Sequence, residues 1–366
     1  MKLRIGVDAG GTFTDVCLLE EESGRIAVTK VSSTPADPSA AILNGIASIL
    51  HQENGRAADV NYLAHGTTVG TNAIIQRTGA RTGLITTEGF RDLLELGRQR
   101  RPDLYDLQVD KPVPLVPRDL RLEVPERACY DGRVERPLDT EAMARAARLL
   151  KEKGVQAVAV CFLHSYLNPR HEQQAREILL RDLPGVYVST SHEVLPEFRE
   201  FERLSTVTIN AYLGPVMSEY IRNLETQLSR LGISVRTYIT QSNGGIISTQ
   251  TARDNSVRTV LSGPSAGVVG GNYVGAAAGF DNLITFDMGG TSTDVSLIEK
   301  GHLKVTGEME VQGYPIRIPM LEVNTVGAGG GSVAWIDSGG HLKVGPRSAG
   351  AEPGPACYGL GNEEPT

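Results

Sequence analysis

Cysteine is scarce in this sequence, and long apolar runs are missing altogether. The 366 residues include only four cysteines, and no two of them form a CxxC pair. Such spacing favours reduced thiols over a disulfide framework or a zinc site. The N-terminal segment enters a strand pattern at once and lacks the apolar run of a signal peptide, and no stretch reaches the length of a transmembrane helix. The sequence therefore predicts a cytoplasmic protein with no membrane partner.

A surplus of basic residues is also missing. The formal net charge is −7, which argues against a nucleic-acid partner, because such proteins present a basic face. A nucleotide enzyme is not excluded, since Mg²⁺ and backbone amides can hold phosphates. No GxxxxGK[ST] loop occurs, and the glycine run at residues 327–331 lacks the strand–helix context of a dinucleotide fingerprint. That run is predicted to be a flexible loop near the phosphates, or simply a turn.

Apolar periodicity predicts an α/β fold with a mixed sheet. The first hundred residues read as three hairpin-linked strands followed by crossover units, in the order β-β-β-α-β-α-β-α. Asp37 and Pro38 form an N-cap and first helical position for the first helix. The expected strands are 3–7, 12–19, 25–32, 60–64 and 81–86, and the expected helices are 38–50, 69–77 and 90–96.

The remaining chain begins with a segment rich in proline and charge, which we interpret as an irregular insertion at about residues 99–138. Near residue 283 the opening three-strand pattern begins again. A helix at 200–231 is expected to break at Gly214–Pro215. The other expected elements are strands at 155–162, 186–189, 234–240, 283–287, 293–299 and 303–311, with helices at 169–180 and 264–278.

Two related domains are the natural division of a chain of this length. We place the first at residues 1–195 and the second at 196–366. After Val323 the chain becomes rich in glycine and then stops without the helices that followed the first three strands. The second domain is therefore expected to be incomplete at its C-terminal end.

One nine-residue motif occurs twice, 279 positions apart (287 minus 8). Residues 8–16 read DAGGTFTDV and residues 287–295 read DMGGTSTDV, so seven of nine positions are identical. An apolar strand precedes each copy. A single copy is equally consistent with a plain β-hairpin, but two copies in the same context indicate two similar domains that face each other. We call the two copies the twin hairpins.

The residue types of the twin hairpins suit phosphate binding. Asp8 and Asp287 end their strands, where the carboxylates can hold Mg²⁺ and serve as the catalytic residues. Bare glycine backbone lets N–H groups approach phosphate oxygens, and threonine adds hydroxyl donors. Positioning and charge neutralisation account for most of phosphoryl transfer, so the motif predicts an ATP-using enzyme with a nucleotide cleft. The predicted phosphate ligands are Gly10, Gly11, Thr12, Thr14, Gly289, Gly290, Thr291 and Thr293, with Gly329 and Gly330 from the later glycine run.

With its other motifs included, the sequence resembles the hydantoinase A/5-oxoprolinase family, which includes the A-type component of N-methylhydantoinase and related components of acetone and acetophenone carboxylases. The resemblance implies two actin-like ATPase (ribonuclease H-like) domains around the nucleotide cleft. It also implies ATP-dependent activation of a carbonyl or lactam oxygen, and a companion hydantoinase B-type subunit. Family members run to about twice this length, and their later FGGAGP motif is not in this chain. The matching stretches are 6–16, 65–77, 83–107, 241–245, 261–271, 286–296 and 324–332.

Four further residues are candidate substrate contacts. His65 opens the segment HGTT after a predicted strand, and a local hydrogen bond is an equally good interpretation. Thr67 and Thr68 precede a helix, so they are also candidate N-caps. Arg98 lies in a basic run that could neutralise a carboxylate or phosphate, although a solvated loop is the commoner explanation.

Three functions are compatible with these residues. The first is an ATP-dependent amidohydrolase subunit that phosphorylates the amide oxygen of a hydantoin or 5-oxoproline-like ring. The second is a ketone carboxylase subunit with the same phosphate site. The third is an actin-like or chaperone-like ATPase without small-molecule chemistry, and the motifs outside the twin hairpins argue against it.

Overall fold

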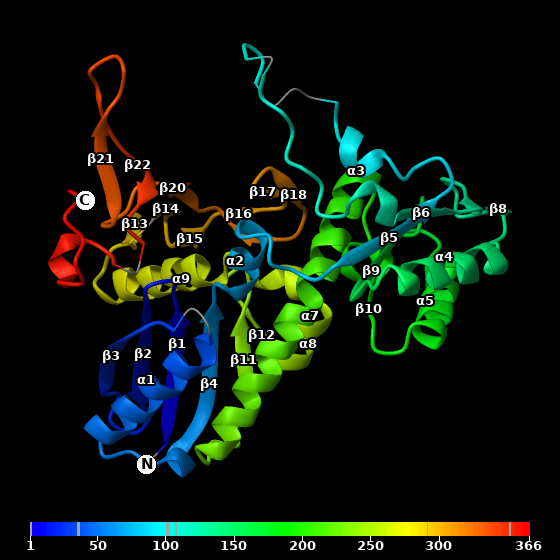
Figure 1. Cartoon of the computed structure of the whole chain (residues 1–366). Coiled ribbons are helices and arrows are strands. Elements are labelled where there is room, and N and C mark those ends of the chain that lie inside the picture. The colour runs from blue at the N-terminus through cyan, green and yellow to red at the C-terminus, as the bar shows by residue number, and fades with distance from the viewer. Residues whose placement is uncertain (1, 35–36, 100–102, 107, 291, 351–352) are drawn as a thin grey trace.

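The computed structural model describes residues 2–34, 37–99, 103–106, 108–290, 292–350 and 353–366. Its first layer is a six-stranded mixed sheet with the order β12-β11-β4-β1-β2-β3 (Figure 1). β1 pairs antiparallel with β2 and parallel with β4, and β4 pairs parallel with β11. The strands are β1 (Leu3–Ala9), β2 (Phe13–Glu20), β3 (Ile26–Ser32), β4 (Val60–Thr67), β11 (Thr237–Thr240) and β12 (Ile246–Ser248).

Helix α1 (Pro38–Gln52) packs on this first sheet. Its N-cap is Asp37, whose carboxylate accepts a hydrogen bond from the Ser39 backbone, with Pro38 at the first helical position. Ile42, Ile46 and Ile49 recur at helical spacing and are fully buried. The expected helix is confirmed, and its apolar stripe covers the sheet. Next along the chain come η1 (Ala57–Asp59) and α2 (Val69–Ile75).

A second, four-stranded sheet has the order β10-β9-β5-β6 and is parallel throughout. Every residue of its central strand β9 is buried, as expected of a parallel sheet covered on both faces. Its strands are β5 (Thr82–Thr87), β6 (Arg121–Val124), β9 (Ala157–Cys161) and β10 (Tyr187–Thr190). Around it lie α3 (Leu93–Leu96), η2 (Arg118–Leu120), the β7–β8 pair (Arg127–Ala128, Val134–Arg136), α4 (Thr140–Glu152), α5 (Arg170–Asp182) and α6 (Ser191–Val194).

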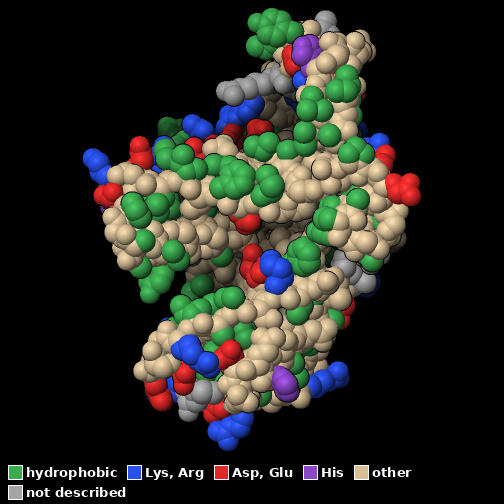
Figure 2. Space-filling model, turned by 90° about the vertical axis from the view of Figure 1, so that its left-hand side faces the viewer, with side chains coloured by type: hydrophobic (Ala, Val, Ile, Leu, Met, Phe, Trp, Pro, Cys, Tyr) green, Lys and Arg blue, Asp and Glu red, His purple; other side chains and the backbone are tan. Residues whose placement is uncertain are grey.

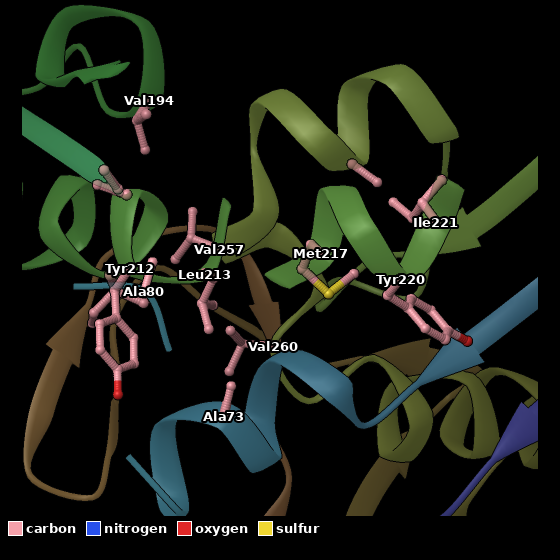
Figure 3. Close-up of a cluster of buried hydrophobic side chains, with 14 of the residues drawn as sticks. Ala73, Ala80, Val194, Tyr212, Leu213, Met217, Tyr220, Ile221, Val257 and Val260 are labelled. Atoms are coloured by element: carbon pink, nitrogen blue, oxygen red, sulfur yellow. The ribbon is translucent and has the colours of Figure 1, made fainter. Parts of the chain in front are cut away.

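The 31-residue helix α7 (Glu200–Arg230) joins the two sheets. It packs on β9 and β10 of the second sheet and also on α1 and α2 beside the first. Figure 3 shows Leu213, Met217 and Tyr220 of this helix packed beside Ala73 of α2 and against Val257 and Val260. The predicted break at Gly214–Pro215 is wrong, because the helix continues through Pro215. After β12 follow α8 (Thr249–Asp254) and η3 (Ser256–Thr259).

A third sheet repeats the opening hairpin of the first. β13 (Leu283–Met288) pairs antiparallel with β14 (Thr293–Glu299), which also pairs with β15 (His302–Leu303) and β20 (Asn324–Val326). Helix α9 (Ser262–Ala277) runs between this sheet and the first one (Figure 1). The remaining pairs are β16–β19 (Val305–Thr306, Met320–Leu321), β17–β18 (Met309–Val311, Tyr314–Ile316) and β21–β22 (Ser332–Ile336, Leu342–Ser348), and the last helical turn is η4 (Ala356–Tyr358).

The repeated hairpins differ in how they are covered. On β1, Ile5 and Val7 are 1% and 5% exposed, whereas their counterparts on β13, Ile284 and Phe286, are 71% and 65% exposed. The outer edge of β1 pairs with β4, but β13 is an edge strand among the described residues. A cavity of about 370 Å³ lies between α9 and this edge. The first hairpin is therefore inside a core and the second is covered on one side.

The mixed α/β fold that the sequence predicted is confirmed, but strand membership differs from the expected order. β5 was expected to continue the first sheet and instead belongs to the second. β11 and β12 lie beyond residue 196 and complete the first sheet, so that sheet crosses the predicted boundary between residues 195 and 196. Helix α4 was not predicted, and the expected strand at 303–311 is three short strands. The division at residue 195 stays a prediction.

Among the described residues, we find no helix with the length and apolar character needed to cross a bilayer.

Candidate functional site

The twin hairpins share one backbone geometry. Asp8 is paired in register with Asp15 on the neighbouring strand, and Asp287 is paired with Asp294 in the same way. The Gly10 N–H donates to the Phe13 carbonyl at 3.0 Å, and the Gly289 N–H donates to the Ser292 carbonyl at 2.9 Å. The two turns are therefore closed by the same hydrogen bond, 279 residues apart.

The tips of the two hairpins lie against each other. A Cβ placed on Gly290 would be 3.2 Å from Thr12 Oγ1, so the second turn touches the first. No atom lies within 4 Å of the corresponding point at Gly11, at the tip of the first turn. Figure 2 shows the face of the molecule that lies at the left in Figure 1. A hollow separates the upper and lower parts of this face, and acidic side chains lie beside it. This arrangement has the form of a cleft with a hairpin on each side.

Helix α9 brings the two aspartates together. A Cβ on Gly263 would lie 3.1 Å from Asp8 Oδ1, and a Cβ on Gly267 would lie 3.9 Å from Asp287 Oδ2. Residues four apart share a helix face, so both carboxylates approach the same face of α9. A Cβ on Gly66 of β4 would be 3.0 Å from Asp8 Oδ1. Glycine at these positions leaves room for the carboxylate.

Asp8 is held in an environment that disfavours its charge. Burial, helped by the negative charges of Asp287 and Asp15, raises the pKa of Asp8 to about 6, against a smaller opposing effect of Lys30. Its Oδ1 atom is buried and has no hydrogen-bond partner among the described residues. An ionised carboxylate oxygen without a partner is costly in such a site. A cation at this point would relieve both the desolvation and the repulsion.

These residues fit Mg²⁺. The described residues contain no group of three or more His, Cys, Asp or Glu side chains arranged for a metal. Mg²⁺ does not need one, because it is commonly bound by one or two carboxylates together with water and substrate phosphates. The unpartnered Asp8 oxygen and the nearby Asp287 match that pattern, while their catalytic and metal-binding roles stay predictions.

The neighbouring aspartates are held by hydrogen bonds. Asp15 accepts from Lys30 Nζ at 2.8 Å, and Asp294 accepts from Thr325 Oγ1 at 2.6 Å. Burial raises the pKa of Asp294. Each side chain thus ties its hairpin to the next strand of its sheet.

The glycine run after β20 packs on the second hairpin. The Gly330 N–H donates to the Gly289 carbonyl at 2.9 Å, and the Gly331 N–H donates to the Gly290 carbonyl at 2.7 Å. A Cβ on Gly329 would lie 2.6 Å from the Gly289 oxygen. The structure therefore places the run beside the second hairpin, as a support whose Gly330 and Gly331 N–H groups already donate within the protein.

Two family models match this chain, and between them they span nearly all of it. The model described as hydantoinase/oxoprolinase N-terminal region matches residues 4–183, and the model described as hydantoinase/oxoprolinase matches residues 203–366. The chain belongs to the hydantoinase/oxoprolinase family. The motif-based resemblance is therefore confirmed.

Relatives within the family have different named activities. The alpha subunit of the caprolactamase of Pseudomonas jessenii is 43% identical over 99% of this chain and 53% of its own length. The crystal structure of that ATP-dependent caprolactamase superposes with a TM-score of 0.87 at 42% identity, over 99% of this chain and 53% of that one. The gamma subunit of the acetophenone carboxylase of Aromatoleum aromaticum is 35% identical over 99% of this chain and 52% of its own length. The 5-oxoprolinase 1 of Arabidopsis thaliana is 36% identical over 99% of this chain and 30% of its own length. The chain thus spans about half the length of the first of these relatives and less of the oxoprolinase.

The hydroxyl groups of two predicted phosphate ligands are engaged inside the protein. Thr14 is fully buried and hydrogen-bonded to Ser33 at 3.0 Å. Thr293 is 4% exposed and donates to the Ala328 carbonyl at 2.5 Å. Both threonines therefore brace their hairpins and do not face the cleft. Of the motif threonines, Thr12 lies at the contact between the hairpins, and Thr291 is outside the described residues.

The structure does not present His65 to a substrate. His65 is fully buried in β4, where one ring nitrogen is hydrogen-bonded to the Tyr220 hydroxyl. Burial lowers the pKa of His65 to about 4, so the ring is neutral at ordinary pH. The local-hydrogen-bond interpretation is the one that fits, because β4 lies inside a sheet between β1 and β11.

Thr67 and Thr68 connect the first hairpin to α2 and α9. Thr67 is buried, and its hydroxyl accepts from the Val69 N–H at 3.1 Å. The Thr68 hydroxyl donates to the Ala9 carbonyl at 3.1 Å. The Ser262 hydroxyl bonds both the N–H and the carbonyl of Thr67. Ser262, Gly66 and Gly263 were not among the predicted site residues, although they lie in the matching stretches 65–77 and 261–271.

Arg98 lies elsewhere. Its guanidinium forms a two-pronged ion pair with the buried carboxylate of Glu202, with 2.7 Å between Arg98 Nε and Glu202 Oε1. The pair lines a different cavity, and no described twin-hairpin residue is among those that line it.

A single methyl group tests whether the glycine run supports the second hairpin. We expect Gly329→Ala to lower the free energy of unfolding by about 1–3 kcal/mol and to weaken nucleotide binding, because the new Cβ would lie 2.6 Å from the Gly289 oxygen. Thermal unfolding and nucleotide titration would measure the two effects. Gly327→Ala is the matched control, since no atom lies within 4 Å of that Cβ. Equal behaviour of the two variants would contradict the supporting role.

Proposed function

We propose that this chain is the nucleotide-binding portion of an enzyme that uses ATP and Mg²⁺ to phosphorylate the carbonyl oxygen of a cyclic amide and so prepare the ring for opening. The observation that carries the proposal is the meeting of Asp8 and Asp287 on one face of α9, at the tips of two hairpins in contact. The caprolactamase and oxoprolinase names of its relatives support the substrate class.

The proposal includes an actin-like fold of two related domains around the nucleotide. Its support is the antiparallel β1–β2–β3 meander extended by parallel β4 and β11, together with the second copy of the hairpin in β13–β14. In this arrangement each domain contributes one phosphate-binding turn. The hollow between the two parts of the molecule (Figure 2) is where the phosphates would lie.

In the reaction, the amide oxygen attacks the γ-phosphorus, an O–P bond forms, the bond to the β-phosphate oxygen breaks, and ADP leaves. Water attacks the activated carbon and the ring C–N bond breaks, and hydrolysis of the resulting acyl phosphate by a second water releases inorganic phosphate and leaves the carboxylate. The chain's own contribution is positioning: backbone N–H groups of the Gly11 and Gly290 turns would approach the phosphates closely, because glycine itself carries no side chain. Asp8 and Asp287 would hold Mg²⁺, whose chemistry there is neutralisation of phosphate charge.

A ketone carboxylase subunit is the second candidate. The specific observation in its favour is the 35% identity to the gamma subunit of an acetophenone carboxylase. The same turns would then activate a different carbonyl oxygen. Because two of the relatives are named as subunits, we propose a companion hydantoinase B-type subunit in either case.

The decisive experiment is ADP release by the full-length protein together with its companion. Hydantoin, 5-oxoproline, ε-caprolactam, acetone and acetophenone would be compared under identical Mg·ATP. Stimulation by a cyclic amide supports the first candidate, and stimulation by a ketone with bicarbonate supports the second. No stimulation by any member of this panel would contradict both.

A further inference from the structure

A second cavity has a volume of about 930 Å³, and no described residue of the twin hairpins lines it. It lies where the segment around α3, the N-terminal turns of α7 and the β17–β18 hairpin meet (Figure 1). These three elements are far apart in the chain, so a molecule bound here would join them. A cavity of this size is ample for a small metabolite.

One wall of the cavity is a polar stripe on α7. Glu202, Ser205 and Thr208 follow at intervals of three and all line it. Glu202 is paired with Arg98, and the Ser205 hydroxyl donates to the Pro315 carbonyl at 2.7 Å. The first two members of the stripe are therefore satisfied within the protein.

The third member of the stripe, Thr208, has no such hydrogen bond among the described residues. Thr208 is 1% exposed, and its hydroxyl has no hydrogen-bond partner among the described residues. Two other threonines of the same helix, Thr206 and Thr226, donate to the carbonyl four residues earlier, at 2.7 and 2.8 Å. A buried hydroxyl without a partner carries the cost of its desolvation. This orphan group in a cavity wall points to a polar ligand.

The rim of the cavity carries charges of both signs. The basic residues of its lining are Arg98, Lys111 and Arg199, and the acidic ones are Glu95, Asp110, Glu202, Glu308 and Glu310. Arg98 is paired with Glu202, and Lys111 Nζ donates to the Leu96 carbonyl at 2.8 Å, so Arg199, Glu308 and Glu310 are the main charges open to a ligand. Arg199 and Glu308 are only loosely paired, with 3.9 Å between their nearest charged atoms and about half of each side chain exposed. A ligand with one charge would leave the opposite charges of the rim uncompensated, whereas a ligand with both could meet each of them.

The backbone around the rim is strained. Arg199 has φ 76° and ψ 91°, values that are unfavourable for a residue with a side chain. It lines the cavity. Strain of this kind persists where surrounding structure enforces it and is concentrated at functional sites.

We propose that this cavity binds a zwitterionic amino acid whose amino and carboxylate groups are separated by a short aliphatic chain. Its carboxylate would face Arg199, its ammonium group would face Glu308 and Glu310, and the chain would lie on Phe201 and Tyr314, which also line the cavity. Ring opening of a lactam yields this class of molecule. The identification of the ligand as a reaction product therefore rests on the proposed function, and the site would hold product away from the phosphates.

Calorimetric titration of the chain with 6-aminohexanoate and L-glutamate tests the site without nucleotide or turnover. We expect saturable binding of at least one of them, and binding at least about tenfold weaker for hexanoate, hexylamine and ε-caprolactam, each of which lacks one or both charges. No saturable binding, or equal binding of the neutral lactam, would overturn the proposal. Since ADP release is measured separately, failure here is distinguishable from failure of the proposed function.

Two variants and one control test whether the amino acid binds in this cavity. Thr208→Val should weaken 6-aminohexanoate or glutamate binding about tenfold while leaving the melting temperature unchanged or higher, because it removes an unpaired hydroxyl. Arg199→Gly removes one cation and relieves the positive φ, so it should also lose affinity without loss of stability. Thr226→Val is the control, on the exposed part of the same helix. Affinity that is unchanged in the first two variants, or equally reduced in the third, would contradict the assignment.

Discussion

Replacing Asp8 by asparagine is expected to stabilise the chain at pH 8 by about 2–3 kcal/mol and, in the ATP-using enzyme proposed above, to reduce ATP turnover by about 100-fold or more. Burial and the charges of Asp287 and Asp15 raise the pKa of this carboxyl from 3.8 to about 6. Above pH 6 the folded chain carries a buried charge that the unfolded chain solvates. The amide removes that cost together with the proposed metal ligand.

The pH dependence has a definite sign. A carboxyl whose pKa is raised on folding destabilises the folded state most when it is ionised in both states, so the penalty is full above pH 6. As the pH falls through 6 the folded state takes up a proton, and below 3.8 the penalty is gone. The stability difference between parent and Asp8→Asn should therefore shrink from about pH 8 to about pH 4, as measured by urea unfolding at each pH.

Asp15→Asn is the matched control, because this side chain is 53% exposed and paired with Lys30. Its stability should change by no more than about 0.5–1 kcal/mol, and part of any gain would come from Asp8, whose pKa the Asp15 charge helps to raise. If Asp8→Asn left stability unchanged at high pH, the Asp8 carboxylate would not be desolvated in the folded chain. If it left turnover unchanged, Asp8 would not be a ligand of the phosphate site.

The twin hairpins allow a second large-effect prediction with an internal control. Val7→Asp should destabilise the chain by about 4 kcal/mol or more, because Val7 is 5% exposed and a lone carboxylate there has no partner. Phe286→Asp, at the corresponding position of the second hairpin, should change stability by less than about 0.5 kcal/mol, because Phe286 is 65% exposed. Urea denaturation of both variants would measure the difference.

The same pair of variants reports on the covering of β13. The chain spans about half the length of relatives such as the caprolactamase alpha subunit, and further polypeptide that packs on β13 would bury Phe286. In such a longer protein Phe286→Asp should become nearly as damaging as Val7→Asp. Equal damage already in the 366-residue chain would mean that the exposed face of β13 is buried in solution.

The local elements of the fold were predictable because their signals are local. Gly10 and Gly289 close their turns through hydrogen bonds to the third residue along, and the flanking strands are marked by alternating apolar residues. Asp37 and Pro38 marked the start of α1 in the same way. The helix α4 was missed although it has an Asp139 N-cap and buried residues at helical spacing, because it directly follows the proline-rich segment.

The membership of the sheets was not predictable from such signals. β1 pairs with residues 60–67, which in turn pair with residues 237–239, and no local pattern records which distant strand a parallel edge accepts. The burial of His65 has the same origin. Its segment HGTT looks like an exposed loop in sequence, but β11 and Tyr220 enclose it in the folded chain.

By itself the sequence determined that this protein carries the same hairpin twice, with an aspartate before each glycine pair, because turn chemistry depends on neighbouring residues. It also determined the family through motifs spread along the whole chain. Only the tertiary structure decided that Asp8 has a buried Oδ1 without a partner among the described residues, that Thr14 and Thr293 are structural, and that Arg98 belongs to a separate cavity. Those properties depend on which distant elements pack together, and packing between distant elements sets burial, charge and partners.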